Sequence, residues 1–194
     1  MGRIIVSNMH VFDEERNVLV YADNAEIGYG NINIKIEVYR ARVLGWFLDV
    51  AKGIVADGRA PGDYVAVMVA LSYIEGLEQF REGKETPRSS SASWFRRSAS
   101  RIFPEQSEEV LQRIWKETRC GLFHAGFPSG KIYLSHDRRS AIEVDGDRIY
   151  INPNEFVDRV VCHFLYYIDE LQNERNADLR KHFEQLWDLL WTKT

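Results

Sequence analysis

The chain has 194 residues, a formal net charge of −4, and 45% hydrophobic against 28% charged residues, which is ordinary for one globular domain with a sizeable core. It contains no run of about 18 apolar residues and no basic-then-apolar N-terminus, so we expect a cytoplasmic protein with no membrane-spanning segment or secretory signal. Cys120 and Cys162 form no Cys-x-x-Cys or Cys/His cluster, so the sequence indicates neither a zinc site nor a disulfide framework.

The charge is unevenly distributed along the chain. Residues 83–140 contain 11 Lys/Arg and 6 Asp/Glu, whereas the remainder contains 14 and 23. A basic segment of this kind can bind nucleic acid, although charge runs often mark no more than a solvated face.

Residues 1–30 are predicted to form an N-terminal extended arm or β-hairpin. Residues 4–6 and 18–20 are apolar and β-branched, and the polar residues 13–17 between them predict a turn joining two short strands. Gly28-Tyr29-Gly30 then marks a boundary. No Gly-Lys-Ser/Thr or third spaced glycine follows it, so a phosphate-binding loop is not predicted.

Residues 31–194 are predicted to form one mainly α-helical domain. Apolar residues recur at helical spacing over residues 34–55, 63–82, 107–125, 153–168 and 179–190. Asp63 is predicted to cap the second of these helices. A shorter helix is expected over residues 94–103, after a flexible loop over residues 84–93 and before Pro104.

A small β-structure is predicted as an insertion at about residues 131–152, before the last helices. Its three apolar stretches include two that flank Asp145-Gly146, a strong signal for a tight hairpin turn because both central residues adopt positive φ. We therefore expect an antiparallel hairpin or meander. Asn152-Pro153 then predicts a capped helix start with proline at its first position.

The strongest candidate for a functional site is the segment Arg119-Cys120-Gly121-Leu122-Phe123-His124-Ala125-Gly126. It lies at the end of a predicted helix of about 18 residues that Ser107 caps and Gly126-Phe127-Pro128 terminates. Arg3 to His10 and Arg175 to His182 have a similar spacing. Only the Arg119 pair ends a long amphipathic helix inside the basic segment.

Arg119 and His124 are predicted to be catalytic. An arginine is always charged and its planar fork suits phosphate oxygens, while a neutral imidazole can accept or donate a proton near neutral pH. His124 would deprotonate a ribose 2′-hydroxyl or protonate the leaving oxygen, and Arg119 would stabilise the charge on phosphorus. Such a site needs no metal and no other cofactor.

Helix geometry limits how these two side chains can meet. Five residues of regular helix rotate by about 500°, which places the two positions roughly 140° apart around the axis. They converge only if the last turn unwinds, which Gly121 and Gly126 permit, or if two copies of the chain meet across a dimer axis.

Basic side chains around this segment are predicted to contact RNA. Arginines four residues apart share a helix face, and arginine with nearby aromatic residues suits single-stranded RNA, although a solvated face explains the same pattern. The candidates are Arg96, Arg97, Arg101, Lys116, Arg138 and Arg139. His136 lies in the same loop as the last two, at the edge of the expected cleft. His136 and Asp137 are not expected to act as a pair, because adjacent strand residues point apart.

The Arg-x4-His motif at the end of a main helix in a small α domain resembles the HEPN family, over about residues 35–174. The resemblance implies a HEPN-like helical bundle, a homodimer that pairs two motifs, and metal-independent endoribonuclease activity in a toxin or phage-defence role, with an antitoxin or regulatory protein as partner. Cys120 stands where members often carry Asn, His or Asp. Gly126 stands where nucleotidylated members carry tyrosine, which argues against that form of regulation.

Two alternatives remain open on the sequence. The fold can be kept without the chemistry, as a non-catalytic helical module for dimerisation or for binding RNA or protein, which Cys120 and the acidic remainder favour. The chain can instead be an unrelated small-molecule enzyme or binder that uses a pocket between helices, although no cofactor motif is present.

Overall fold

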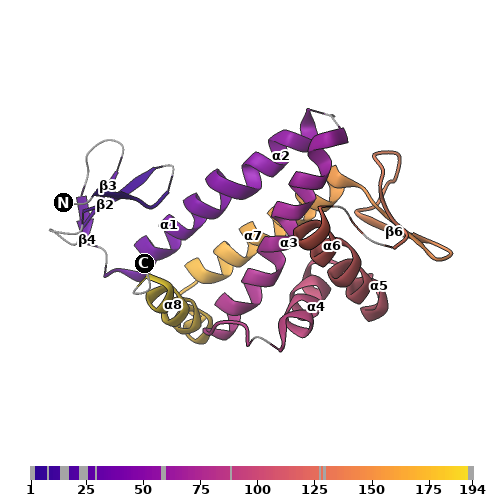
Figure 1. Ribbon diagram of the computed structural model, residues 1–194. Coiled ribbons are helices and arrows are strands. Elements are labelled where there is room, and N and C mark those ends of the chain that lie inside the picture. The colour runs from indigo at the N-terminus through magenta and orange to yellow at the C-terminus, as the bar shows by residue number, and fades with distance from the viewer. Residues whose placement is uncertain are drawn as a thin grey trace.

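The computed structural model describes residues 3–7, 9–13, 18–21, 26–28, 30–57, 60–87, 89–126, 128 and 130–191. Over these residues the chain is mainly helical, with two small sheets at opposite ends of the helical bundle (Figure 1). The predicted class, mainly α with a small β insertion before the last helices, is confirmed.

The first half of the bundle is a continuous rod followed by one long helix. The rod consists of α1 (Ile32–Val43), the π-helical turn η1 (Leu44–Leu48) and α2 (Asp49–Ala56), and α3 (Ala60–Glu82) follows. Asn31 caps α1 by accepting a hydrogen bond from the backbone N–H of Asn33. The predicted cap at Asp63 is wrong, because α3 begins at Ala60 and the Asp63 side chain binds His136 instead.

The second half contains the helix that carries the candidate site. Its helical elements are α4 (Ser91–Ile102), α5 (Glu108–Arg113), the π-helical turn η2 (Ile114–Arg119), α6 (Cys120–Ala125), α7 (Pro153–Gln172) and α8 (Ala177–Trp191). Ser107 caps α5, and Gly126 ends α6 with a φ of 75°, as predicted. Helix α4 starts at Ser91, within the segment predicted as a loop. Among the described helices, none combines the length and apolarity needed to cross a membrane.

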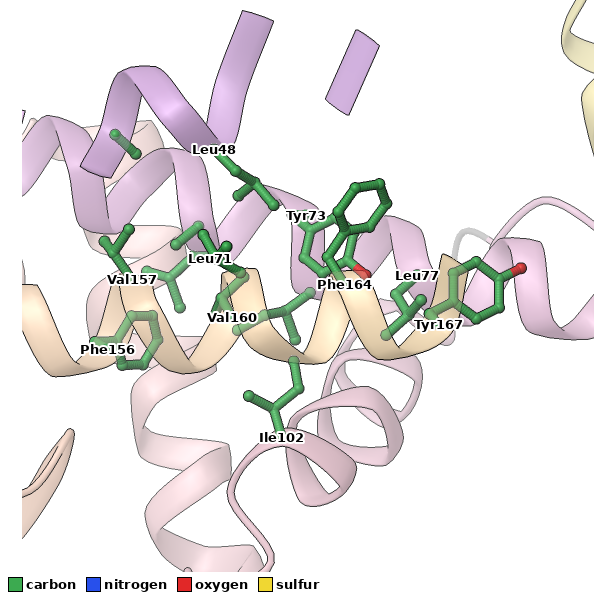
Figure 2. Close-up of a cluster of buried hydrophobic side chains, with 14 of the residues drawn as sticks. Leu48, Leu71, Tyr73, Leu77, Ile102, Phe156, Val157, Val160, Phe164 and Tyr167 are labelled. Atoms are coloured by element: carbon green, nitrogen blue, oxygen red, sulfur yellow. The ribbon is translucent and has the colours of Figure 1, made fainter. Parts of the chain in front are cut away.

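The core lies between α3 and α7, with the other helices around them. Phe156, Val160 and Phe164 of α7 are fully buried, as are Leu71 and Leu77 of α3, and Figure 2 shows these side chains meeting between the two helices. Aromatic rings close the middle of this layer, where Phe164 lies edge-on to Tyr73 at 5.3 Å and to Tyr39 at 5.7 Å. Burial of each such side chain stabilises the fold by about 1.5–3 kcal/mol.

The N-terminal region is a four-stranded antiparallel meander rather than a two-stranded hairpin. Its strands in order are β1 (Arg3–Ile5), β2 (His10–Asp13), β3 (Val18–Tyr21) and β4 (Glu26–Gly28). The two predicted strands exist, but β2 lies between them and pairs with both. Strand β2 was not predicted because it has no run of aliphatic residues. Its residues alternate in burial, with His10 and Phe12 facing the interior. Phe12 packs edge-on against Trp191 at 5.2 Å, which seats the sheet on α8.

The inserted sheet differs from the predicted antiparallel meander. Its strands are β5 (Ile132–Leu134), β6 (Ile142–Asp145) and β7 (Arg148–Ile151), in the order β5-β7-β6. The Asp145-Gly146 hairpin is present between β6 and β7, but β5 runs parallel to β7. The hairpin places β6 along one edge of β7. Strand β5 lies along the other edge and runs in the same direction as β7, because the loop after β5 crosses over before β6 begins. The insertion packs its isoleucines inward, at Ile132, Ile142, Ile149 and Ile151.

Asn152 joins this sheet to α7, and its loss is expected to destabilise both. Its Oδ1 caps α7 by accepting from the backbone of Asn154 and Glu155, and its Nδ2 donates to the carbonyl of Arg138. Asn152→Ala is therefore expected to lower the free energy of unfolding by roughly 1–3 kcal/mol in chemical denaturation. Gln172→Ala is the control, because Gln172 is exposed at the other end of α7 and its change should stay within about 0.5 kcal/mol.

Candidate functional site

Arg119 is the last residue of the π-helical turn η2, and a carboxylate of α3 holds it. Its Nη2 lies 2.7 Å from Oε2 of Glu75, and the two side chains are 25% and 15% exposed. Oε1 of Glu75 accepts a hydrogen bond from the hydroxyl of Ser91 in α4. The guanidinium is thus fixed between three helical segments while part of it reaches solvent. Turns of π-helix occur frequently at functional sites.

The other predicted catalytic residue, His124, has a described backbone only, and its side chain lies outside the described residues. The backbone shows that α6 remains α-helical from Cys120 to Ala125 and ends at Gly126. The last turn therefore does not unwind, and positions 119 and 124 stay roughly 140° apart around the axis. Of the two routes that would bring them together, only the meeting of two chains is compatible with this backbone.

The chain folds back against η2 directly after α6. Gly130 has a φ of 72°, and a Cβ at this position would overlap the carboxylate of Glu117. That carboxylate also accepts from Nε of Arg113 at 3.2 Å, one helical turn earlier. The positive φ favours glycine at this position, and the start of the insertion lies against Glu117 of the helix that carries the candidate site.

Four of the predicted RNA-binding arginines face carboxylates. Nε of Arg97 lies 3.3 Å and Nη2 of Arg101 lies 3.5 Å from Oε1 of Glu78, whose side chain is completely buried. Arg96 lies 3.5 Å from Glu108, and Arg138 lies 3.5 Å from Glu143 and stacks over the ring of Tyr150 at 3.8 Å. These pairs compensate buried or nearby negative charge, which leaves less of their charge for phosphate.

Lys116 and Arg139 are placed differently from these arginines. Both side chains are exposed, and neither forms an ion pair with the described residues. Lys116 lies on η2 itself, and Arg139 lies in the loop after β5. They are the predicted RNA contacts whose charge remains most accessible.

His136 is paired with a carboxylate distant in sequence. Its Nε2 lies 2.7 Å from Oδ2 of Asp63 in the first turn of α3, and the Asp63 side chain is 4% exposed against 37% for His136. Asp137, its neighbour in sequence, is exposed and has no part in this pair. Sequence reasoning missed Asp63 because nothing local connects the two positions.

The loop that carries His136 is held by buried and bonded side chains. Nδ2 of Asn152 donates to the carbonyl of Arg138 at 2.6 Å, and Oε1 of Glu143 accepts from the backbone of Ser140 at 3.0 Å and of Arg139 at 2.9 Å. The hydrogen bond from Ser140, with those from Arg139 and Arg138, holds the pKa of Glu143 below its ordinary value.

Glu75 and Glu78 were also missed, although the sequence contains a signal for them. Together with Glu82 they recur at spacings of three and four residues, which places three carboxylates along one side of α3. Acidic residues interleaved with apolar core positions indicate buried ion pairs, and the basic helix after residue 90 supplies the partners.

His163 of α7 lies half-buried beside the core. Its Nδ1 is buried without a hydrogen-bond partner among the described residues. Desolvation, with smaller contributions from Arg81 and Arg101, lowers its pKa to about 4. The ring is therefore neutral at neutral pH. The histidine of the Arg175/His182 pair also has a structural contact, because its Nδ1 forms a hydrogen bond with the carbonyl of Arg81.

Two apolar cavities lie away from Arg119. One, of about 370 Å³, is lined by residues of α1, α3 and α8, and a second, of about 230 Å³, is lined by residues of α1, η1 and α3. Both include Tyr39 and Phe80, and no lining residue of either belongs to η2 or α6. In the described part of the chain, no three His, Cys, Asp or Glu side chains are grouped to hold a metal ion.

The double variant Arg97→Ala/Arg101→Ala is expected to lower the free energy of unfolding by roughly 2–4 kcal/mol, because it leaves the buried Glu78 carboxylate without its cations. Chemical denaturation at neutral pH measures this loss. Lys116→Ala and Arg139→Ala are the matched controls, since exposed cations should change stability by no more than about 0.5 kcal/mol. Equal effects in all the variants would contradict the role assigned to Glu78.

The shifted pKa of His163 predicts a loss of stability in mild acid. Between pH 6.5 and about 4 the unfolded chain binds a proton at this residue and the folded chain does not, so stability falls as the pH falls through this window. His163→Asn should remove about 1–2 kcal/mol of this dependence, a value discounted for the partial exposure of the ring. Denaturation of both proteins from neutral to acid pH tests it, and parallel curves would contradict it.

Comparison with known proteins identifies no relative of this chain. No family model matches it, and neither a curated protein nor a solved structure does so. What the chain does is therefore inferred from the geometry of its own residues.

Proposed function

We propose that this chain is a HEPN-like, metal-independent endoribonuclease that acts as a homodimer on cytoplasmic RNA. The observation that carries the proposal is the placement of Arg119. It ends a π-helical turn, is fixed by Glu75 at 2.7 Å, and precedes the position of His124 by five residues on the same helical segment. A permanently charged fork held rigidly on the helix that also carries a histidine suits phosphodiester cleavage between two protomers.

The proposed chemistry assigns one task to each residue. The imidazole of His124 takes the proton of a ribose 2′-hydroxyl, and the freed oxygen attacks the adjacent phosphorus. Arg119 stabilises the negative charge that grows on the phosphoryl oxygens. The products are an end with a 2′,3′-cyclic phosphate and an end with a 5′-hydroxyl, and no step needs a metal ion.

The regular geometry of α6 supports the proposed homodimer. Because positions 119 and 124 face different directions in one chain, a complete site takes Arg119 from one protomer and His124 from its partner. Lys116 and Arg139 supply accessible positive charge for the RNA backbone, with Arg96, Arg97, Arg101 and Arg138 in secondary contacts. A nuclease of this kind harms its host unless restrained, so we propose an antitoxin or regulatory protein as a further partner.

The alternative is a non-catalytic helical module for dimerisation or for binding RNA or protein. The pairing of Arg119 with Glu75 favours it, because an arginine that neutralises a half-buried carboxylate has a structural role of its own. In that case Arg119 is needed for stability rather than for a reaction.

Cleavage of single-stranded RNA in EDTA tests the proposal. The protein is expected to leave 2′,3′-cyclic phosphate ends, and His124→Ala and Arg119→Ala are each expected to lower kcat/KM by about 100-fold or more. Arg175→Ala is the matched control, because Arg175 precedes His182 at a similar spacing and should leave cleavage unchanged. Variants that lower the melting temperature, in a protein that leaves RNA intact, would support the non-catalytic module.

A further inference from the structure

We propose that the two apolar cavities beside Tyr39 form one binding site for an amphipathic organic anion, a molecule with an aromatic body and one carboxylate or sulfonate group. The inference is independent of the proposed ribonuclease function, because neither cavity is lined by a residue of η2 or α6. The first cavity lies where α8 packs against α1 and α3, and the second lies where η1 packs beside α3. Tyr39 and Phe80 line both cavities, so the two are neighbours.

Aromatic rings form most of the wall of the first cavity. The ring centroids of Tyr39 and Phe80 are 4.4 Å apart, and the rings of Trp187 and Trp191 stack at 5.9 Å. Such walls favour an aromatic ligand, because offset and edge-on contacts between rings add to the gain from burial. Small-molecule sites typically measure roughly 300–1,000 Å³. The first cavity, of about 370 Å³, can therefore hold a ring system by itself.

Arg42 determines the charge of the ligand that fits. It lies half-buried on α1 and is the one charged side chain among the described residues that line the two cavities. Its guanidinium stands over the ring of Trp46 at 5.2 Å. Stacking uses the face of a guanidinium, whereas its N–H groups lie in the plane and suit the paired oxygens of a carboxylate or sulfonate. Apolar walls exclude water and strengthen this attraction, so the site favours an anion over a neutral molecule or a cation.

The second cavity extends the apolar part of the site. It measures about 230 Å³, and it reaches solvent beside Phe47 and Ser72, which are both exposed. Gly76 also lines it, and a Cβ at this position would meet no atom within 4 Å. Glycine in the middle of a helix destabilises that helix. At position 76 it also leaves room beside Tyr39 for the apolar body of a ligand.

Two fluorescent probes with the same apolar body test this site on the full chain. Anilinonaphthalene sulfonate and phenylnaphthylamine both contain a naphthalene and a phenyl ring, and only the first carries a negative charge. The unaltered protein is expected to bind one molecule of the sulfonate, about 10-fold more tightly than the neutral amine. Trp187 and Trp191 line the first cavity, so a bound probe should also quench tryptophan emission by energy transfer.

One pair of variants tests the charge of the site. Arg42→Gln is expected to weaken binding of the sulfonate by about 10-fold and to change binding of the amine by less than about twofold. Arg40→Gln is the matched control and should change neither affinity. Arg40 is exposed on the same helix and lines neither cavity.

A second pair of variants tests the apolar part. Gly76→Leu places a side chain in the second cavity and is expected to weaken binding of both probes by about 10-fold. Gly53→Leu is the matched control and should leave both affinities unchanged. Gly53 is exposed on α2, lines neither cavity, and also has room for a Cβ.

The outcomes distinguish this site from a face that binds apolar groups of any charge, including those of another protein. Equal affinity of the unaltered protein for the two probes, or binding that does not saturate at one molecule, would overturn the proposal. An Arg42→Gln protein that still prefers the sulfonate would do the same, as would a Gly76→Leu protein that binds both probes unchanged. Should Gly76→Leu fail to fold, Ser72→Leu replaces it, because Ser72 is exposed on the wall of the same cavity.

Discussion

Carboxylates buried along α3 are the constraint on which the candidate site depends. A charged carboxylate inside a protein destabilises the fold unless a cation or hydrogen-bond donor compensates it. Glu78 and Asp63 are buried and the Glu75 side chain is 15% exposed, and each binds a side chain from a different segment of the chain. The positions of α4, η2 and the inserted loop relative to α3 are thus coupled to three electrostatic contacts as well as to apolar packing.

These ion pairs change what can be inferred about RNA binding from the basic segment, residues 83–140. Residues 83–140 carry an excess of positive charge, yet three of their arginines, Arg97, Arg101 and Arg119, pair with carboxylates of α3. Replacing an arginine that compensates a buried carboxylate lowers stability. A loss of activity in such a variant would therefore not distinguish a role in RNA binding from a role in folding. Cations outside such pairs, such as Lys116, report on RNA binding more cleanly.

Features set by local chemistry were predictable from the sequence. The helix ended by Gly126, the Asp145-Gly146 hairpin and the capped start of α7 each depend on residues within a few positions of one another. The parallel pairing of β5 and the partner of His136 depend on residues distant along the chain, 73 positions in the case of Asp63. Periodicity contains no information about such contacts, and only the spacing of acids on α3 hinted at their existence.

The insertion consists of a sheet that packs on the bundle and a loop, after β5, that contacts α3. The inward isoleucines bury the sheet against the bundle, which positions the loop after β5. Backbone bonds to Asn152 and Glu143 fix the conformation of that loop, and the His136 side chain connects it to Asp63 of α3. On a helix, side chains project at fixed angular steps, so positions 119 and 124 of one chain cannot face the same direction. The loop after β5, bound to Asp63 at the start of α3, instead presents side chains whose positions the sheet and its backbone hydrogen bonds determine.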